Sequence, residues 1–185
     1  MNAHVPARNR QTRALVVAFG VGSLVAVGLG VYGSTHEPAF FALNLAGFSS
    51  GLAAKAWLAT GAFLLAVVQL VSALIMYGRI PVRAPSWIGG LHRWSGRAAV
   101  LLTVPVAVHC LYALGFQGYS TRVLVHSLLG CFFYGAFVVK ILAVRVRGLP
   151  NWLLPVVGGV VFVTLVGIWL TSSFWFFRNV GFPEF

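Results

Sequence analysis

The feature that most constrains this chain is a series of five apolar runs, each about as long as a helix that crosses a lipid bilayer. Of its 185 residues, 59% are hydrophobic and only 8% are charged, whereas a soluble domain carries about 25% charged residues. Because backbone polar groups in lipid must be satisfied within the protein, runs of this length predict helices. We therefore expect an all-α integral membrane bundle of about five transmembrane helices.

The apolar runs also define the predicted domain organisation. A basic tail occupies residues 1–13 and an outer tail occupies residues 177–185, on either side of a transmembrane domain at residues 14–176. The predicted spans lie at residues 14–32, 55–77, 91–116, 122–146 and 152–176.

The first apolar run and the linker that follows it allow two further predictions. Gly22, Ala26 and Gly30 recur four residues apart in the first run, a spacing typical of close helix packing in membranes. The longest linker, residues 34–54, contains a weakly apolar stretch at residues 40–48. We expect this stretch to lie along the membrane surface.

The distribution of basic residues predicts the orientation. With the N-terminus inside, ten of the thirteen Lys and Arg residues lie on the cytoplasmic side, whereas Lys55, Arg122 and Arg178 lie outside. This bias predicts a cytoplasmic N-terminus, and we expect a multi-pass protein of a bacterial plasma membrane. The basic residues that give the net charge of +11 lie between the apolar runs and not along one face of a soluble helix. Nucleic-acid binding is therefore not expected.

No Asp or Glu lies within any predicted span, because the two acidic residues are Glu37 and Glu184. Hydrolysis by paired carboxylates and catalysis by a Ser-His-Asp triad both lack their acid. A proton-coupled carrier usually places a carboxylate at mid-membrane, and none is present. These three classes are disfavoured.

Two histidines lie at similar depths in consecutive spans. His109 lies about 10 Å below the outer end of the third span, and His126 lies about 6 Å inside the fourth, at 1.5 Å per residue. Two neutral imidazoles are a common ligand pair of a b-type haem. The pair therefore predicts one non-covalent haem b near the outer face, with His109 and His126 bound to the iron. A hydrogen-bonded histidine pair and a different metal are the alternatives.

The residues around this pair suit a flat cofactor. Gly130 lies four residues after His126, on the same helix face, and leaves room beside that ligand. Arg122, at the outer end of the fourth span, is a predicted partner of haem propionates. Pro105 lies four residues before His109 and is expected to bend the third span.

A second polar group lies at the cytoplasmic side. This predicted inner-side site consists of His92, Arg93, Arg97 and Lys140. It can be interpreted as contact with lipid headgroups or as a pocket for an anionic or quinone headgroup. Gln69, near the middle of the second span, is expected to hydrogen-bond to another helix. His36 is expected to be an exposed residue of the outer linker.

The segment 91–140 carries a family resemblance. Its motifs LHRWSGR, VAVHCLYALGF and VLVHSLLGCFFYGAFVVK resemble transmembrane b-type cytochromes of the cytochrome b561 and ferric-reductase kind. The chain as a whole is similar to five-helix actinobacterial membrane proteins described as b561-like, which share the start of the second span at residues 55–60 and the closing WLTSSFWFF.

The resemblance implies haem ligation by His109 and His126. In the ferric-reductase pattern a second histidine follows the first by about fourteen residues. Val106 occupies that position here, so the ligand role does not extend to His92. The implied function is electron transfer between a membrane donor, such as a quinol, and an outer-side redox partner, as the membrane part of an oxidoreductase. The alternative is a cofactor-free small subunit or assembly factor of a respiratory or other membrane complex.

Overall fold

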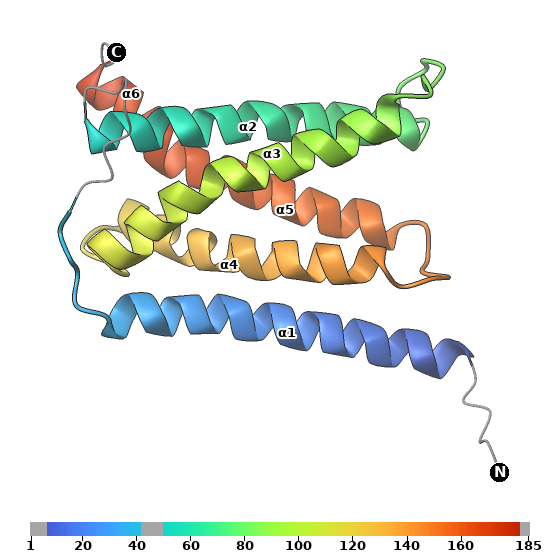
Figure 1. Cartoon of the computed structure of the whole chain (residues 1–185), viewed down its shortest axis with the longest axis horizontal. Coiled ribbons are helices and arrows are strands. Elements are labelled where there is room, and N and C mark those ends of the chain that lie inside the picture. Colours follow the sequence, from blue (N-terminus) through green and yellow to red (C-terminus); the bar gives the residue numbers. More distant parts are fainter. Residues whose placement is uncertain (1–6, 42–49, 182–185) are drawn as a thin grey trace.

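The computed structural model describes residues 7–41 and 50–181, and within them it is built of helices without strands. Five helices are long and apolar enough to cross a membrane, which confirms the all-α prediction. Two of them continue through π-helical segments, η1 and η2, and the short α6 is the last described helix (Figure 1). The elements are α1 Ala7–Thr35, α2 Gly51–Met76, α3 Ile88–Val108, η1 His109–Leu114, α4 Thr121–Val144, α5 Leu153–Trp169, η2 Leu170–Phe174 and α6 Trp175–Val180.

Helix α1 starts earlier than the sequence indicates. It begins at Ala7, so residues 7–13 of the predicted basic tail are helical. The side-chain amide of Gln11 donates to the carbonyl oxygens of Arg147 and Gly148, at 3.2 and 3.1 Å, and ties this first turn to the connection between α4 and α5. The predicted surface stretch at residues 40–48 lies almost wholly outside the described residues, since 42–49 are not described.

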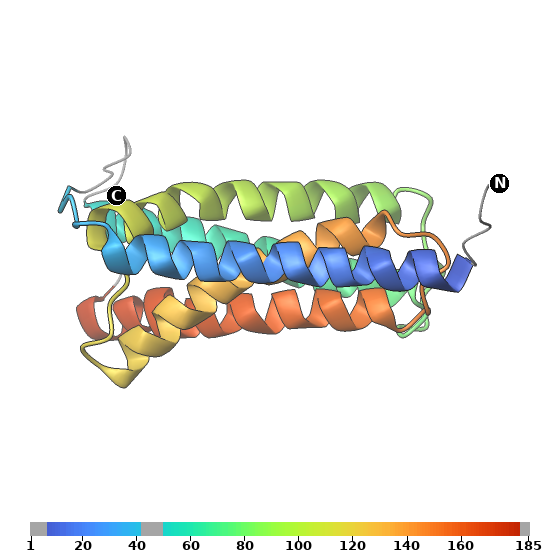
Figure 2. The ribbon, with the colours of Figure 1, turned by 90° about the horizontal axis from the view of Figure 1, so that it is seen from below.

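The bundle has a layered arrangement in which sequence neighbours are not always packing neighbours. Helix α2 packs along α3 and α5, and α4 packs along α1 and α5 (Figures 1 and 2). Helices α3 and α4 follow one another in the chain but share no extended interface. The Tyr134 hydroxyl bridges them by contacting Thr103 Oγ1 at 3.0 Å and the Thr103 carbonyl oxygen at 3.1 Å. The interior between α3 and α4 is therefore open enough for cavities.

The outermost helix, α1, is held by a glycine contact. A Cβ atom added at Gly22 would lie 2.7 Å from the carbonyl oxygen of Gly135, and one added at Gly135 would lie 2.8 Å from Ala26 Cβ. Neither position has space for a side chain, so the two backbones touch. The small-residue stripe predicted in the first run is confirmed as the α1–α4 contact.

The contact between α2 and α3 includes one polar bridge inside the membrane. The Gln69 amide donates to the carbonyl oxygen of His92 and to Ser95 Oγ, the latter at 3.0 Å. Gly96 leaves the space for this amide, since a Cβ atom there would lie 2.9 Å from Gln69 Oε1. The predicted role of Gln69 as a helix–helix hydrogen-bonding residue is confirmed.

The two ends of the bundle differ in charge. One end, which we call the basic end, holds the start of α1 and the α2–α3 and α4–α5 connections (Figure 1). The other, which we call the His126 end, holds the start of α2, the α3–α4 connection and α6. Arg79, Arg83 and Arg145 belong to the basic end, whereas Lys55 and Arg122 belong to the His126 end.

Candidate functional site

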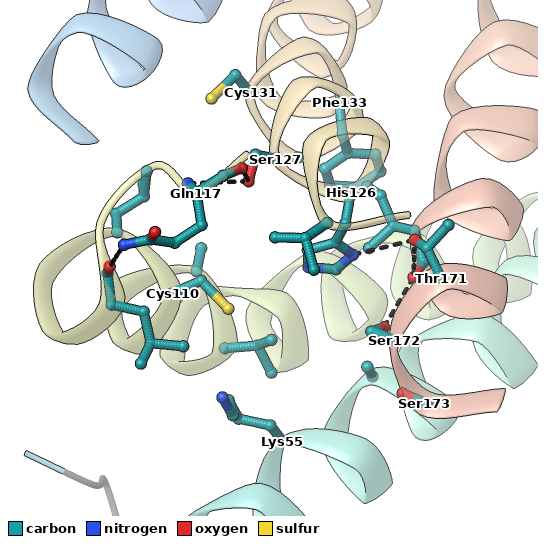
Figure 3. Close-up of a pocket in the computed structure, with 18 of the residues that line it drawn as sticks. Lys55, Cys110, Gln117, His126, Ser127, Cys131, Phe133, Thr171, Ser172 and Ser173 are labelled. Atoms are coloured by element: carbon teal, nitrogen blue, oxygen red, sulfur yellow. Dashed lines mark hydrogen bonds between the residues drawn. The ribbon is translucent and has the colours of Figure 1, made fainter. Parts of the chain in front are cut away.

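A cavity of about 340 Å³ lies inside the His126 end. This volume falls at the lower end of the range of about 300–1,000 Å³ that is usual for small-molecule sites. Its wall is formed by α2, α3 with η1, α4 and α5 with η2, and is mostly apolar. The polar side chains that line it include Lys55, Gln117, Arg122, His126, Ser127, Thr171, Ser172 and Ser173. We call it the His126 cavity (Figure 3).

The imidazole of His126 is held by a neighbouring hydroxyl. His126 Nδ1 lies 3.1 Å from Thr171 Oγ1, and this oxygen is also 2.8 Å from the carbonyl oxygen of Gly167 (Figure 3). A hydroxyl has one proton and a carbonyl can only accept. Both contacts are satisfied when Thr171 donates to Gly167 and His126 Nδ1–H donates to Thr171. In this arrangement the lone pair of the ring lies on His126 Nε2, and the residue lines the cavity.

Two cations line the same cavity. The Arg122 guanidinium donates to the carbonyl oxygen of Thr171 at 2.6 Å and lies 3.9 Å from the centre of the Trp175 ring. Lys55 enters from α2, near the Cys110 side of the space (Figure 3). No Asp or Glu occurs in any of the five long helices, so no intrahelical carboxylate neutralises these charges.

One buried polar atom of this cavity wall has no hydrogen-bond partner among the described residues. Ser173 is 1% exposed, and its Oγ makes no hydrogen bond within the described chain. A buried hydroxyl of this kind costs free energy unless a donor or acceptor reaches it. Together with Lys55 and Arg122, Ser173 makes this end of the cavity suited to an anionic group.

The predicted room beside His126 is present. Gly130 lines the cavity, and a Cβ atom at this glycine would meet nothing within 4 Å. Both cysteines, Cys110 and Cys131, also line the space and form no disulfide. Within residues 7–41 and 50–181, no group of three or more His, Cys, Asp or Glu side chains is arranged to hold a metal ion.

The structure does not bring His109 into this cavity. His109 is 4% exposed at the first position of η1, and the adjacent Cys110 lines the cavity in its place. The change from α to π geometry occurs four residues after Pro105, whose missing N–H interrupts the helical hydrogen bonds. Of the predicted haem-binding residues, His126, Arg122 and Gly130 therefore share one cavity, whereas His109 does not line it.

A second cavity, of about 1240 Å³, opens at the basic end between α2, α3, α4 and α5. We call it the His92 cavity. His92 and Lys140, two of the four residues of the predicted inner-side site, line it. Arg93 and Arg97 do not, and the Arg97 guanidinium instead lies 4.8 Å from the centre of the Trp94 ring on the exposed face of α3. Phe133 and Leu165 line both cavities and separate them.

His36 differs from its expected role as an exposed linker residue. Its ring stacks between Tyr32 and Tyr112, with centroid distances of 5.0 and 4.8 Å, and its Nε2 is buried. This stack joins the end of α1 to η1. The prediction that His36 lies exposed was wrong, because two aromatic neighbours on different helices cover it.

The sequence alone does not identify several residues of the His126 cavity as site residues. It indicates Lys55 only as a charge on the outer side, and Thr171 and Ser173 only as part of the closing WLTSSFWFF segment. The sequence pattern that could have indicated these site residues is one cation, Lys55, and three consecutive hydroxyl residues, 171–173, at the ends of apolar runs. The two motif segments do meet in space, since Trp169 Nε1 donates to Thr60 Oγ1 at 3.0 Å.

Fold and cavities together define a multi-pass helical membrane protein with an internal, cation-lined site at one end. A family model described as a family of unknown function, DUF6529, matches residues 15–184. The chain belongs to this family. No curated protein and no solved structure matches it with significance.

Proposed function

We propose that the chain is a membrane b-type cytochrome that binds one haem b in the His126 cavity, with His126 as an axial ligand. The observation that carries this function is the contact between His126 Nδ1 and Thr171, which leaves Nε2 free for a metal. Histidine ligands of metals almost always donate their other ring N–H in this manner.

The charges of the cavity support an anionic cofactor. Lys55 and Arg122 have no carboxylate partner within the helices, and the Ser173 hydroxyl is buried without a partner. Haem carries two propionate carboxylates, which these three side chains would bind and orient. The apolar wall and the open space at Gly130 would accommodate the ring and exclude water.

On the α4 side of the cavity His126, Arg122 and Gly130 would suit haem, whereas on the α3 side Cys110 and not His109 lines the space. The resemblance to b-type cytochromes implies His109 as the second ligand, whereas the adjacent Cys110 lines the cavity and His109 does not. We therefore assign His126 as the ligand that the geometry supports and keep His109 as the ligand that the resemblance implies. Haem supplies one-electron redox chemistry when bound, and the protein contributes ligation, orientation and low dielectric.

An absorption spectrum of the protein purified in detergent from haem-replete cells tests this function. We expect a Soret band, an α band that appears on reduction with dithionite, and close to one haem per chain in a pyridine haemochrome assay. Electrons would then pass between a quinol in the membrane and a redox partner at the His126 end. A colourless protein would contradict the proposal and would favour a cofactor-free subunit or assembly factor.

We further propose that the basic end faces the cytoplasm and that the protein resides in the plasma membrane, because most Lys and Arg residues lie at this end. A membrane-impermeant thiol reagent should label a Tyr119→Cys variant in intact cells, since Tyr119 is exposed at the His126 end. It should label an Arg147→Cys variant only after lysis. The reversed pattern would show the opposite orientation.

A further inference from the structure

The strongest unassigned feature is the charge inside the His92 cavity. Lys140 lies within α4 and lines this cavity, and no acidic residue occurs in any membrane-spanning helix to neutralise it. A charged side chain within a membrane is costly unless it is paired or hydrated. An anion from outside the membrane-spanning helices would neutralise Lys140.

The position of Lys140 indicates where that anion would lie. Lys140 precedes the last residue of α4 by four positions, so it lies about 6 Å inside the helix end. His92 lies four positions after the start of α3, at a similar depth. Arg79, from the α2–α3 connection, lines the same cavity near its opening. His92 and Lys140 thus lie about one helical turn inside the basic end, within reach of a lipid headgroup.

His92 contributes a hydrogen-bond acceptor to this group. Its Nδ1 lies 2.9 Å from Ser72 Oγ, and Ser72 is 3.1 Å from the carbonyl oxygen of Gln69. As at Thr171, both contacts are satisfied when Ser72 donates to the carbonyl and His92 Nδ1–H donates to Ser72. His92 Nε2 then keeps its lone pair and, in the described chain, accepts no hydrogen bond, so a hydroxyl donor from a ligand could reach it.

The deeper part of the cavity is apolar and roomy. Phe133, Phe137 and Phe162 line it, and Cβ atoms added at Gly158 and Gly159 would meet nothing within 4 Å. At about 1240 Å³ the space exceeds what a headgroup alone would fill. Its form therefore suits an amphiphile whose polar head stays at the basic end and whose chain extends inward.

We propose that the His92 cavity binds one anionic phospholipid with a hydroxyl-bearing headgroup. Its phosphate would pair with Lys140 and Arg79, a headgroup hydroxyl would donate to His92 Nε2, and an acyl chain would lie against the phenylalanine wall. Basic pockets between transmembrane helices at the cytoplasmic side commonly bind anionic lipid headgroups. This binding is independent of haem in the His126 cavity, from which the site is separated by Phe133 and Leu165.

The test is native mass spectrometry of the full chain released from nanodiscs. The nanodiscs contain phosphatidylglycerol, phosphatidylmethanol or phosphatidylcholine; phosphatidylmethanol has the same charge as phosphatidylglycerol but no headgroup hydroxyl. We expect one retained phosphatidylglycerol per chain and at least about fivefold weaker retention of phosphatidylcholine, the ratio that one basic residue gives. Phosphatidylmethanol should bind with intermediate strength.

Matched variants separate the site from general surface charge. Lys140→Met should weaken the preference for phosphatidylglycerol by about fivefold, the effect of one basic residue. Arg145→Gln removes an exposed cation at the same end and should keep the preference. His92→Phe should make phosphatidylglycerol and phosphatidylmethanol equivalent and should leave the charge preference intact. If Lys140→Met impairs folding, Lys140→Arg provides a folded test that should retain anionic lipid.

Three results would overturn the proposed lipid site. Equal loss in Lys140→Met and Arg145→Gln would show non-specific binding to the basic end. Thermal stabilisation by inorganic phosphate alone, equal to that by phosphatidylglycerol, would show a phosphate site instead of a lipid site. Equal retention of phosphatidylcholine and phosphatidylglycerol by the unmodified protein would show that Lys140 selects no anion.

Discussion

Replacing His126 by Ala is expected to remove nearly all bound haem. Among the described residues, His126 is the only one that lines the His126 cavity with an imidazole, and the substitution leaves Arg122, Lys55 and the apolar wall in place. A Thr171→Val variant should keep the ligand but lose the hydroxyl that orients it, and such outer-shell changes weaken metal binding by about 10- to 100-fold. Haem per chain and the reduced α band measure both effects.

The chain offers a matched control for Thr171. Thr164 lies on the same transmembrane segment, is 5% exposed and donates to the carbonyl oxygen of Val160, but it lines neither cavity. Thr164→Val should therefore keep the spectrum. Wild-type haem content in His126→Ala would contradict the assignment of His126 as a ligand. If His92→Ala then lost its haem, His92 would be the ligand instead.

The role of His109 is open to the same measurement. If it is the second ligand, His109→Ala should convert a low-spin spectrum into a high-spin one while part of the haem stays bound by His126. An unchanged low-spin spectrum in His109→Ala would show that another group completes the coordination. This result would leave the assignment of His126 intact, because the two substitutions report on different helices.

Much of the fold could be predicted because the bilayer imposes strong conditions on sequence. Length and hydropathy were enough to indicate five spans, since unsatisfied backbone groups are excluded from lipid. Gly22 and Gln69 could be given packing roles for a similar reason, as small and polar residues in spans usually lie at helix contacts. Both roles depend on residue type and hardly at all on which way each helix is turned.

The candidate site could be predicted only in part, because helix rotation is poorly encoded here. Lipid outside the bundle is as apolar as the core, so the hydrophobic pattern does not tell which face points inward. His109 and Cys110 differ by one position, and only the structure shows that Cys110 lines the cavity. Lys55 and Thr171 come from other helices, and sequence spacing gives no measure of their distance from His126.

Replacing Gly22 by Leu is the second change for which we expect a large effect, here on stability. Gly22 is buried against Gly135, and even a Cβ atom would lie 2.7 Å from that carbonyl oxygen. Overpacking of a tight contact costs about 1–3 kcal/mol when the surroundings can shift. Since α4 holds α1 along most of its length, we expect α1 to separate from the bundle.

Gly28→Leu is the control, because Gly28 lies on the same helix with nothing within 4 Å of its added Cβ. It makes the same chemical change on the exposed face, where Leu is favoured over Gly in a helix by up to about 1 kcal/mol. Unfolding in increasing fractions of SDS should therefore shift in opposite directions for the two variants. Equal shifts would mean that α1 is anchored by its hydrophobic insertion alone, and that the backbone contact with Gly135 adds nothing to the stability of the bundle.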